Sequence, residues 1–434
     1  MKSATALSLI FCFTQIQAIS LKNVVSLVNA RFNRNFDRIT SAQDLVQYGI
    51  DPSSVDPNII ADATSTTPEL IERYGYRVEI HRVKTPDGYL LEMHRIPKEG
   101  GVPVYLQHGI LDSSAAWVIM GPTSALAYHL ADLGYDVWMG NCRGNRYSRA
   151  HIKLSPDKKE FWDFSFHEIG VFDVPAMIDF ILEETRYPKI HYIGHSQGTT
   201  AFWVMCSERP VYCDKIISMN ALAPVAFMSH TKSPVIRAIV PFLDQMEIIF
   251  KLLGVYEFMP NNDFLTLIGQ MFCKKEAMTQ ALCMNAIFLI AGYNSDQLNK
   301  TMLPAIIGHI PAGAATKQLI HYGQLIKSGK FRKFDHGWIK NLFKYGSTKP
   351  PAYNLGDVRV PVVLHHSEND WLAQPADVHE LERHLPNVFK RYLVPMPKFN
   401  HLDFIFAIKG REMVNDEVVK VLEDFKNEVT FYDI

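Results

Sequence analysis

Residues 190–198 read Ile-His-Tyr-Ile-Gly-His-Ser-Gln-Gly, and this stretch predicts the fold of the chain. Its first four residues are typical of a short buried strand, and residues 199–207 can follow as a helix. Between them, residues 194–198 match the G-x-S-x-G pattern, in which a sharp strand-to-helix turn exposes a serine hydroxyl. Glycine is expected at both ends of the pattern because a Cβ there would clash with neighbouring backbone. An ordinary glycine-rich turn would also match, so the flanking strand and helix are what favour a nucleophile at Ser196.

A nucleophile of this kind needs an acid and a histidine that follow it in chain order, each after a later strand. Residues 360–365 form an apolar run of the length expected for a buried parallel strand. The polar turn after it holds two candidate acids, Asp370 and Glu368. Asp370 is favoured because Trp371 and Leu372 can shield it from water.

The candidate histidine is His401. It lies in the loop after residues 388–394, which predict the next strand. The chain has 17 histidines, so position has to select among them. His365 and His366 are the alternatives, but they lie within or at the end of a predicted strand and precede the acid.

An oxyanion hole completes such a site. Residues 102–107 predict an early strand that ends in His108-Gly109-Ile110. This ending can free the backbone N–H of Ile110 to act together with the N–H of Gln197. Taken alone, the motif would also fit an ordinary loop between a strand and a helix. Combined with the turn at 194–198, it favours an oxyanion hole.

The pattern along the chain predicts one α/β domain with an insertion. Residues 76–83 and 89–96 alternate in hydrophobicity around a turn and predict a hairpin. Strands and helices then alternate, which predicts a mostly parallel sheet flanked by helices in residues 67–224 and 350–434. The alternation stops in residues 225–349, which predict a helical cap over the carboxyl ends of the strands. Its many apolar residues could pack the cap's own core, or line an acyl-binding groove or an interfacial lid.

Five longer motifs resemble the acid lipases, the family of gastric and lysosomal lipases. They occupy residues 107–113, 134–141, 194–200, 221–226 and 400–404, in the family's order, and the resemblance runs from about residue 67 to the last helix. It implies an α/β-hydrolase core with a helical cap. Residue by residue, it also implies the triad and the oxyanion donors, which are Ser196, Asp370, His401, Ile110 and Gln197. Position 110 holds Ile where the family usually has Leu, a change that a backbone donor tolerates.

The resemblance implies an enzyme that hydrolyses lipid esters, triacylglycerols first and cholesteryl esters next, at a droplet or emulsion surface. No metal or organic cofactor is expected, because zinc-type Cys/His spacing and phosphate-binding glycine loops are absent from the sequence. A soluble short-chain esterase or a thioesterase would use the same triad. An idle lipid carrier would typically have lost a triad member. A net charge of −1 at pH 7 gives no reason to expect a nucleic-acid partner.

The N-terminus predicts a signal peptide at residues 1–18. Lys2 is followed by apolar residues 4–13 and a small-residue cleavage site, and the apolar stretch is too short to be a transmembrane anchor. We therefore expect a secreted protein or one of the lysosomal lumen. Residues 19–66 are polar and predict an N-terminal arm or pro-segment. Asn299 begins the sole N-x-S/T sequon of the sequence, which predicts a glycosylation site.

An oxidising compartment would permit disulfides. Cys206 and Cys213 could pair, or Cys206 could simply be buried behind the nucleophile. Cys142 is predicted to be unpaired. Of the six cysteines, Cys12 would leave with the signal peptide. The last two, Cys273 and Cys283, resemble the family's cap disulfide.

Overall fold

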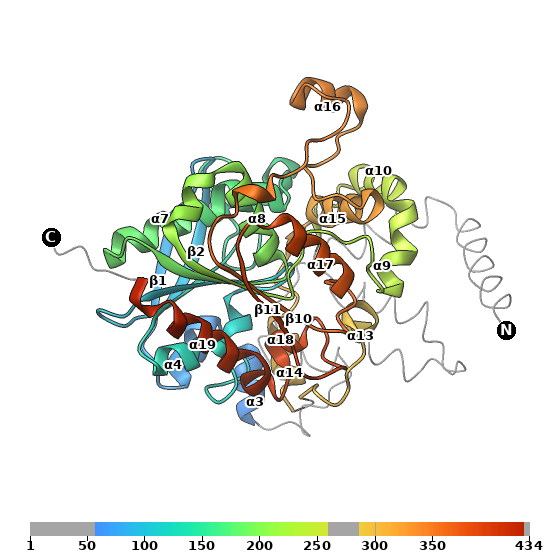
Figure 1. The fold of residues 1–434 in the computed structure, drawn as a ribbon. Coiled ribbons are helices and arrows are strands. Elements are labelled where there is room, and N and C mark those ends of the chain that lie inside the picture. Colours follow the sequence, from blue (N-terminus) through green and yellow to red (C-terminus); the bar gives the residue numbers. More distant parts are fainter. Residues whose placement is uncertain (1–56, 259–285, 300, 429–434) are drawn as a thin grey trace, which may run out of the picture.

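The structure is a computed structural model that describes residues 57–258, 286–299 and 301–428 (Figure 1). The predicted signal peptide, most of the predicted arm and the pair Cys273 and Cys283 lie outside the described residues. Those expectations therefore stay predictions.

A sheet of nine strands forms the centre of the molecule, in the order β1-β2-β4-β3-β6-β7-β10-β11 with β5 beside β2. The first three strands of this order pair antiparallel, and from β4 onward each neighbour is parallel. Both the hairpin and the parallel sheet are thus confirmed. The strands are β1 (Glu79–Lys84), β2 (Tyr89–Ile96), β3 (Pro103–Gln107), β4 (Asp136–Gly140), β5 (Ala150–His151), β6 (Ile190–His195), β7 (Ile216–Leu222), β10 (Val362–His366) and β11 (Val388–Leu393).

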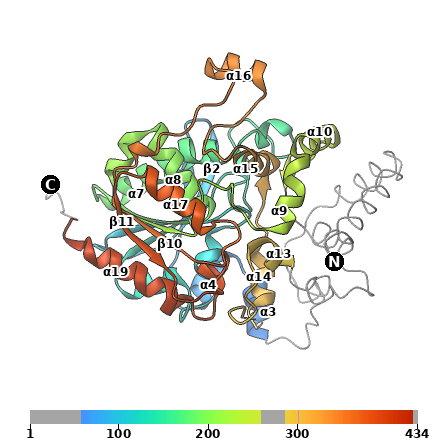
Figure 2. The same cartoon turned by 45° about the vertical axis from the view of Figure 1, so that its right-hand side comes forward.

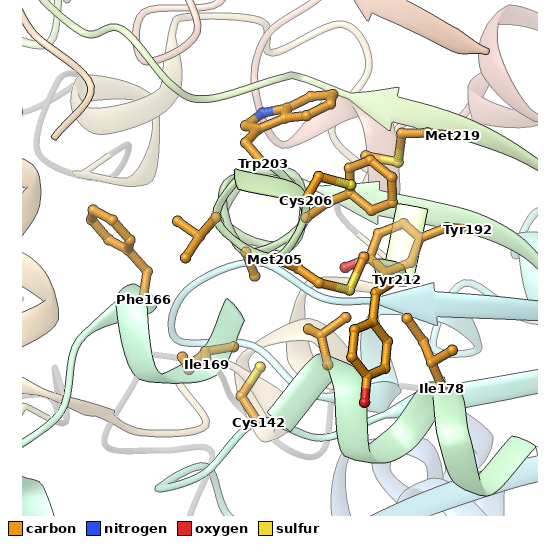
Figure 3. Packing of buried hydrophobic residues seen from close by; sticks show 14 of the residues in the cluster. Cys142, Phe166, Ile169, Ile178, Tyr192, Trp203, Met205, Cys206, Tyr212 and Met219 are labelled. Atoms are coloured by element: carbon orange, nitrogen blue, oxygen red, sulfur yellow. The ribbon is translucent and has the colours of Figure 1, made fainter. Parts of the chain in front are cut away.

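Helices cover both faces of the sheet (Figure 1). Alternate residues of β3 show why two layers are needed: Tyr105 belongs to one buried cluster, whereas Val104 and Leu106 belong to the other. Figure 3 shows the first cluster, where helix α8 packs over the sheet. The helices on this face are α7 (Val174–Thr185), α8 (Gln197–Glu208) and α17 (Pro375–His384), and on the opposite face α4 (Thr67–Arg73), α5 (Leu126–Asp132) and α19 (Asp416–Asp424).

The inserted segment is mainly helical in its described part, and its helices α9, α10 and α13 lie at one side of the sheet (Figure 2). The sequence predicted no strand here, and this is wrong for β8 (Glu257–Phe258) and β9 (Ala314–Ala315), which pair with each other. Strands of two residues are too short to produce an alternating pattern. The helices are α9 (Pro234–Ile239), α10 (Leu243–Leu253), α13 (Ala286–Ala291), α14 (Leu303–His309), α15 (Thr316–Ser328) and α16 (Trp338–Tyr345).

Helix α3 (Pro57–Thr64), at the end of the predicted arm, packs against α14 of the inserted segment. His309 donates from Nε2 to the carbonyl of Asp62 at 2.8 Å. A Cβ on Gly308 would lie 2.2 Å from the carbonyl oxygen of Ala63, so the two helices approach as closely as glycine permits. Residues 57–64 are therefore part of the folded body.

Of the two cysteine alternatives, the structure shows pairing: Cys206 on α8 forms a disulfide with Cys213. Cys142 is buried and free, as predicted. Among the described residues, no helix combines the length and the apolar character that crossing a membrane requires.

Candidate active site

The candidate nucleophile lies in a strained turn between β6 and α8. Ser196 has φ 51° and ψ −116°, a conformation that non-glycine residues rarely adopt. Its backbone N–H donates to the carbonyl of Leu222 at the end of β7, 3.0 Å away. Strain of this kind persists only where the surroundings hold it, and it occurs most often at functional sites.

Glycine is required on both sides of this serine. A Cβ on Gly194 would lie 2.8 Å from the carbonyl carbon of Gly198, and a Cβ on Gly198 would lie 2.2 Å from the carbonyl oxygen of Gln107. Both glycines therefore face neighbouring backbone, as the sequence predicted, and the structure adds that the turn fits directly against the end of β3. Because β4 and β6 lie on opposite sides of β3, this is also where the sheet order reverses, the usual ligand position in α/β sheets.

Three predicted residues meet at this turn. His401 Nε2 is 2.8 Å from Ser196 Oγ, and His401 Nδ1 is 2.8 Å from Asp370 Oδ2. All three side chains are buried. Because a carboxylate only accepts hydrogen bonds, Nδ1 carries the proton and Nε2 is free to accept from the serine hydroxyl.

Backbone hydrogen bonds to its second carboxylate oxygen hold Asp370 in place. Its Oδ1 accepts the backbone N–H groups of Leu372 and Ala373, both at 2.8 Å. These two bonds leave Oδ2 facing His401. The two N–H groups therefore fix the orientation of the carboxyl group toward the imidazole.

The alternatives weighed from the sequence do not reach this cluster. Glu368 is exposed to solvent. His365 is buried and bonds to Asn220 Oδ1 at 3.0 Å, and neither ring nitrogen of His366 has a partner among the described residues. The structure therefore places Asp370 and His401 beside Ser196. The alternatives Glu368, His365 and His366 do not contact it.

The two predicted oxyanion donors belong to segments that border the serine. A Cβ on Gly109 would lie 3.2 Å from Ser196 Cβ, so the loop that carries Ile110 touches the nucleophile turn. Gln197 is the first residue of α8, and the first N–H groups of a helix have no partner within it. Within the described ranges, neither backbone N–H bonds to another protein group.

His195 is a part of this site that the sequence did not reveal. Its Nε2 donates to the backbone carbonyl of His401 at 3.0 Å. Burial, together with nearby His401 and His108, lowers the pKa of His195 to about 3. This imidazole is therefore neutral at ordinary pH. The variable position of G-x-S-x-G gives no signal for such a contact.

A second unforeseen contact comes from the inserted segment. Gln318 of α15 donates from Nε2 to Oε1 of Gln197 at 3.0 Å, and its own Oε1 accepts the N–H of Ala315 at 2.7 Å. Both glutamines are buried. A helix of the predicted cap therefore contacts the side chain of a predicted oxyanion donor.

The loop that carries His401 is stabilised by its own polar residues. Asn400 Oδ1 accepts the N–H groups of Leu402 and Asp403, at 2.8 and 3.0 Å. Asp403 Oδ2 in turn accepts the N–H of Asn400 at 2.8 Å and the amide of Asn294 at 2.7 Å.

No cluster of three or more histidine, cysteine or acidic residues suited to a metal ion occurs within the described parts of the chain.

The sheet order and the nucleophile turn are those of the α/β hydrolases. Residues 102–248 match the family model described as alpha/beta hydrolase fold, and residues 67–121 match the model described as partial alpha/beta-hydrolase lipase region. Among solved structures, a putative lipase from Sulfolobus solfataricus superposes with a TM-score of 0.53 over 80% of this chain and 94% of that chain. At 15% identity, this likeness supports the fold alone.

Curated relatives are much more similar in sequence. Lipase 1 of Drosophila melanogaster is 48% identical over 366 residues, which cover 84% of this chain and 81% of that protein. Human gastric triacylglycerol lipase is 40% identical over 376 residues, 84% of this chain and 93% of that protein. The chain belongs to the acid lipase family and is a carboxylic ester hydrolase.

Proposed function

We propose that this protein is a secreted or lysosomal lipase that hydrolyses neutral-lipid esters, triacylglycerols first and cholesteryl esters next. The observation that carries the proposal is the unbroken hydrogen-bonded chain Ser196–His401–Asp370 at the strained turn. The name of the human relative, gastric triacylglycerol lipase, supports the substrate class.

In this mechanism Ser196 Oγ attacks the ester carbonyl carbon while His401 Nε2 takes the serine proton. The tetrahedral intermediate collapses, and the imidazolium returns the proton to the departing alcohol. Water then attacks the acyl-serine ester by the same route, which releases the fatty acid and restores Ser196. Throughout, Asp370 fixes the tautomer of His401 and stabilises its positive form.

The negative charge of each tetrahedral intermediate would be bound by the N–H groups of Ile110 and Gln197. Removing one oxyanion donor typically raises the barrier by about 3 kcal/mol. Both donors belong to the backbone, which is why Ile in place of the family's usual Leu at position 110 does not alter this role. No step requires a metal ion or an organic cofactor.

We further propose residues 67–224 and 350–434 as the hydrolase core, with residues 225–349 as the cap. The hydrogen bond from Gln318 to Gln197 supports this division, because it brings part of the insertion next to the site. Interfaces between such layers are common places for ligands. A lipid ester would lie between the cap and the turn at Ser196.

The proposed compartment rests on the N-terminus and the cysteines. Removal of residues 1–18 would release the chain into the secretory route, where the disulfide Cys206–Cys213 is stable. Asn299 is partly exposed, so a glycan there is sterically acceptable. Pairing of Cys273 with Cys283 stays part of this proposal.

The first prediction tests the nucleophile. Ser196→Ala should abolish hydrolysis of emulsified triolein and labelling by a fluorophosphonate, because the hydroxyl supplies the reactive oxygen. Secretion should continue, since the change removes one oxygen atom and leaves the core intact. The exposed Ser229→Ala is the matched control and should retain activity. Turnover by Ser196→Ala at near the parent rate would refute the assignment.

Substrate class is tested on the same preparations. Rates on emulsified triolein, cholesteryl oleate and a dissolved short-chain ester should rank in that order for the proposed lipase. Hydrolysis confined to the dissolved ester would instead establish a soluble esterase.

A further inference from the structure

Helix α16 stands apart from the body of the molecule, on the connection between α15 and β10 (Figures 1 and 2). Its pattern of burial is the reverse of that in an ordinary amphipathic helix. The polar Asn341 is completely buried, whereas Trp338, Ile339, Leu342 and Phe343 are 67%, 50%, 48% and 86% exposed. Half of the helix thus consists of large apolar side chains in contact with water.

These four side chains share one face. Trp338 and Leu342 are four residues apart, as are Ile339 and Phe343, and such pairs lie side by side on a helix. At 3.6 residues per turn the four span an arc of about 140°. Asn341 lies outside this arc, so the side chain that anchors the helix and the exposed apolar side chains point in different directions.

Polar contacts hold the helix instead. The amide of Asn341 donates to Asp335 Oδ1 at 2.8 Å and to the carbonyl of Thr348 at 3.1 Å, which ties together the two ends of the segment. The hydroxyl of Tyr345 donates to the carbonyl of Phe334 at 3.0 Å. These hydrogen bonds hold α16 in place and leave its apolar side chains exposed to solvent.

Positive charge borders the apolar face. Segment 330–349 contains six basic residues and one acidic residue, although the whole chain has a net charge of −1. Lys340, Lys344 and Lys349 are exposed, and none of the three is in an ion pair with another described residue. The surface around α16 is thus both apolar and cationic.

We propose that α16 is a docking helix, which inserts its apolar face into a phospholipid-coated lipid surface that carries anionic headgroups. An apolar arc bordered by lysines is typical of helices that lie in the plane of a lipid interface. Anionic headgroups attract such lysines over a distance of about one Debye length. The inference rests on the proposed function, because an enzyme that hydrolyses neutral lipid has to work at a surface of this kind.

The position of α16 fits this role. A cavity of about 640 Å³ is lined by Phe250 of α10, Ile320 of α15 and Lys340 of α16, so these three helices border the same hollow. The outward residues Ile248 and Leu252 of α10 are also exposed. Docking through α16 would therefore bring the inserted segment to the lipid surface.

The test measures binding of the full chain to vesicles, in a Ser196→Ala background so that lipid is not consumed. Vesicles of phosphatidylcholine with a minority of phosphatidylserine supply the anionic surface. Replacing Trp338→Ser together with Phe343→Ser should lower the partition coefficient at least about tenfold, because two large apolar side chains no longer enter the lipid. The matched control, Ile80→Ser with Val211→Ser, removes exposed apolar side chains from other elements and should bind as the parent does.

Two further measurements test the role of the lysines and the insertion of α16 into the lipid. Lys340→Gln with Lys344→Gln should weaken binding to anionic vesicles and flatten its dependence on salt, with little effect on neutral vesicles.

Trp338 can report on insertion because it is the exposed one of the six tryptophans. The others are buried or partly buried: Trp117, Trp138, Trp162, Trp203 and Trp371. Brominated phospholipid should quench the fluorescence of Trp338, and Trp338→Phe should abolish that quenching.

Equal vesicle binding by the parent and the Trp338→Ser, Phe343→Ser variant would overturn the proposal. The proposal would also be overturned if that variant bound vesicles normally but no longer self-associated. The apolar face of α16 would then be covered by a second copy of the chain. Failure of the proposed function would appear separately, as absence of ester hydrolysis by the unmodified chain. Vesicle binding by the Ser196→Ala chain does not depend on that result.

Discussion

At the scale of single residues, His401 is held by three contacts from two segments, the turn at His195 and Ser196 and the loop at Asp370. Its Nδ1 faces Asp370, its Nε2 faces Ser196, and its backbone carbonyl accepts a hydrogen bond from His195. Because burial lowers the pKa of His195 to about 3, that neighbour adds no positive charge beside the ring. His401 is thus fixed in position by a neutral neighbour.

The second prediction separates the two acids near residue 370. Asp370→Asn should lower kcat about 10⁴-fold, because an amide that donates to Nδ1 favours the wrong imidazole tautomer. Glu368→Gln should change kcat little, since Glu368 is exposed and faces solvent. The measurement is kcat on triolein emulsion for both variants. A larger loss for Glu368→Gln would reassign the acid.

At the scale of elements, most of the sheet could be predicted from the sequence because each core strand is an apolar run between turn residues. The run at 102–107 corresponds to β3 (Pro103–Gln107), and that at 388–394 to β11 (Val388–Leu393). Helix α5, between β3 and β4, begins only at Leu126 and ends at Asp132. Gly121 has φ 75° and Pro122 follows it, so a turn precedes the helix.

The candidate site could be predicted as far as its residues follow strands. Ser196, Asp370 and His401 each come after a strand, and parallel strands bring their carboxyl ends to one edge. The contact of Gln318 with Gln197 could not be predicted, because it joins positions 121 residues apart in different elements. Periodicity reports which side of an element is buried, but not which element lies against it.

The third prediction concerns this contact between α15 and α8. Gln318→Glu keeps the acceptor for the N–H of Ala315 but removes the donor to Gln197. Two acceptor oxygens then face each other, and the new carboxylate is buried, so the cost exceeds that of one hydrogen bond of about 1 kcal/mol. The value of kcat on a dissolved short-chain ester should fall at least about fivefold, because Gln197 is held less firmly beside the oxyanion. KM should stay close to that of the parent.

The matched control is Gln324→Glu on the same helix. Its side chain bonds to the backbone of Asp335, away from the turn at Ser196, so kcat should be unchanged. Comparison of melting temperatures separates loss of stability from loss of positioning. Equal kcat values for the two variants would show that Gln318 has only a structural role.

At the scale of the whole molecule, two buried carboxyl groups connect stability to pH. Burial raises the pKa of Asp112 and of Asp403 to about 7 each, although neighbouring hydrogen bonds lower it in part. Asp112 lies in the loop after β3, where its Oδ1 accepts the N–H of Ser113 at 2.7 Å and the charge of Arg146 offsets only part of the desolvation. Each group therefore holds its proton in mildly acidic solution.

The last prediction follows from Asp112. Its carboxyl ionises near pH 4 in the unfolded chain but near pH 7 in the folded one. The contribution of this group to stability is therefore fully present below about pH 4 and is lost as pH rises through 7. Asp112→Asn cannot ionise and still offers an oxygen to the N–H of Ser113. Its free energy of unfolding relative to the parent should rise by up to about 4 kcal/mol between pH 4 and 7 and then level off.

Denaturant unfolding from about pH 4 to 7 measures the difference in the free energy of unfolding between Asp112→Asn and the parent. A surface carboxylate is the control. The hydrogen bond and the charge of Lys398 lower the pKa of the fully exposed Asp296, so the stability that this carboxylate adds is lost only as pH falls below about 4. Between about pH 5 and 7 the difference between Asp296→Asn and the parent should therefore stay flat, whereas the difference for Asp112→Asn should rise. A flat difference for Asp112→Asn would mean that water reaches this carboxyl in the folded protein. A rising difference would show that the loop beside Ile110 is most stable in acidic solution, where Asp112 keeps its proton.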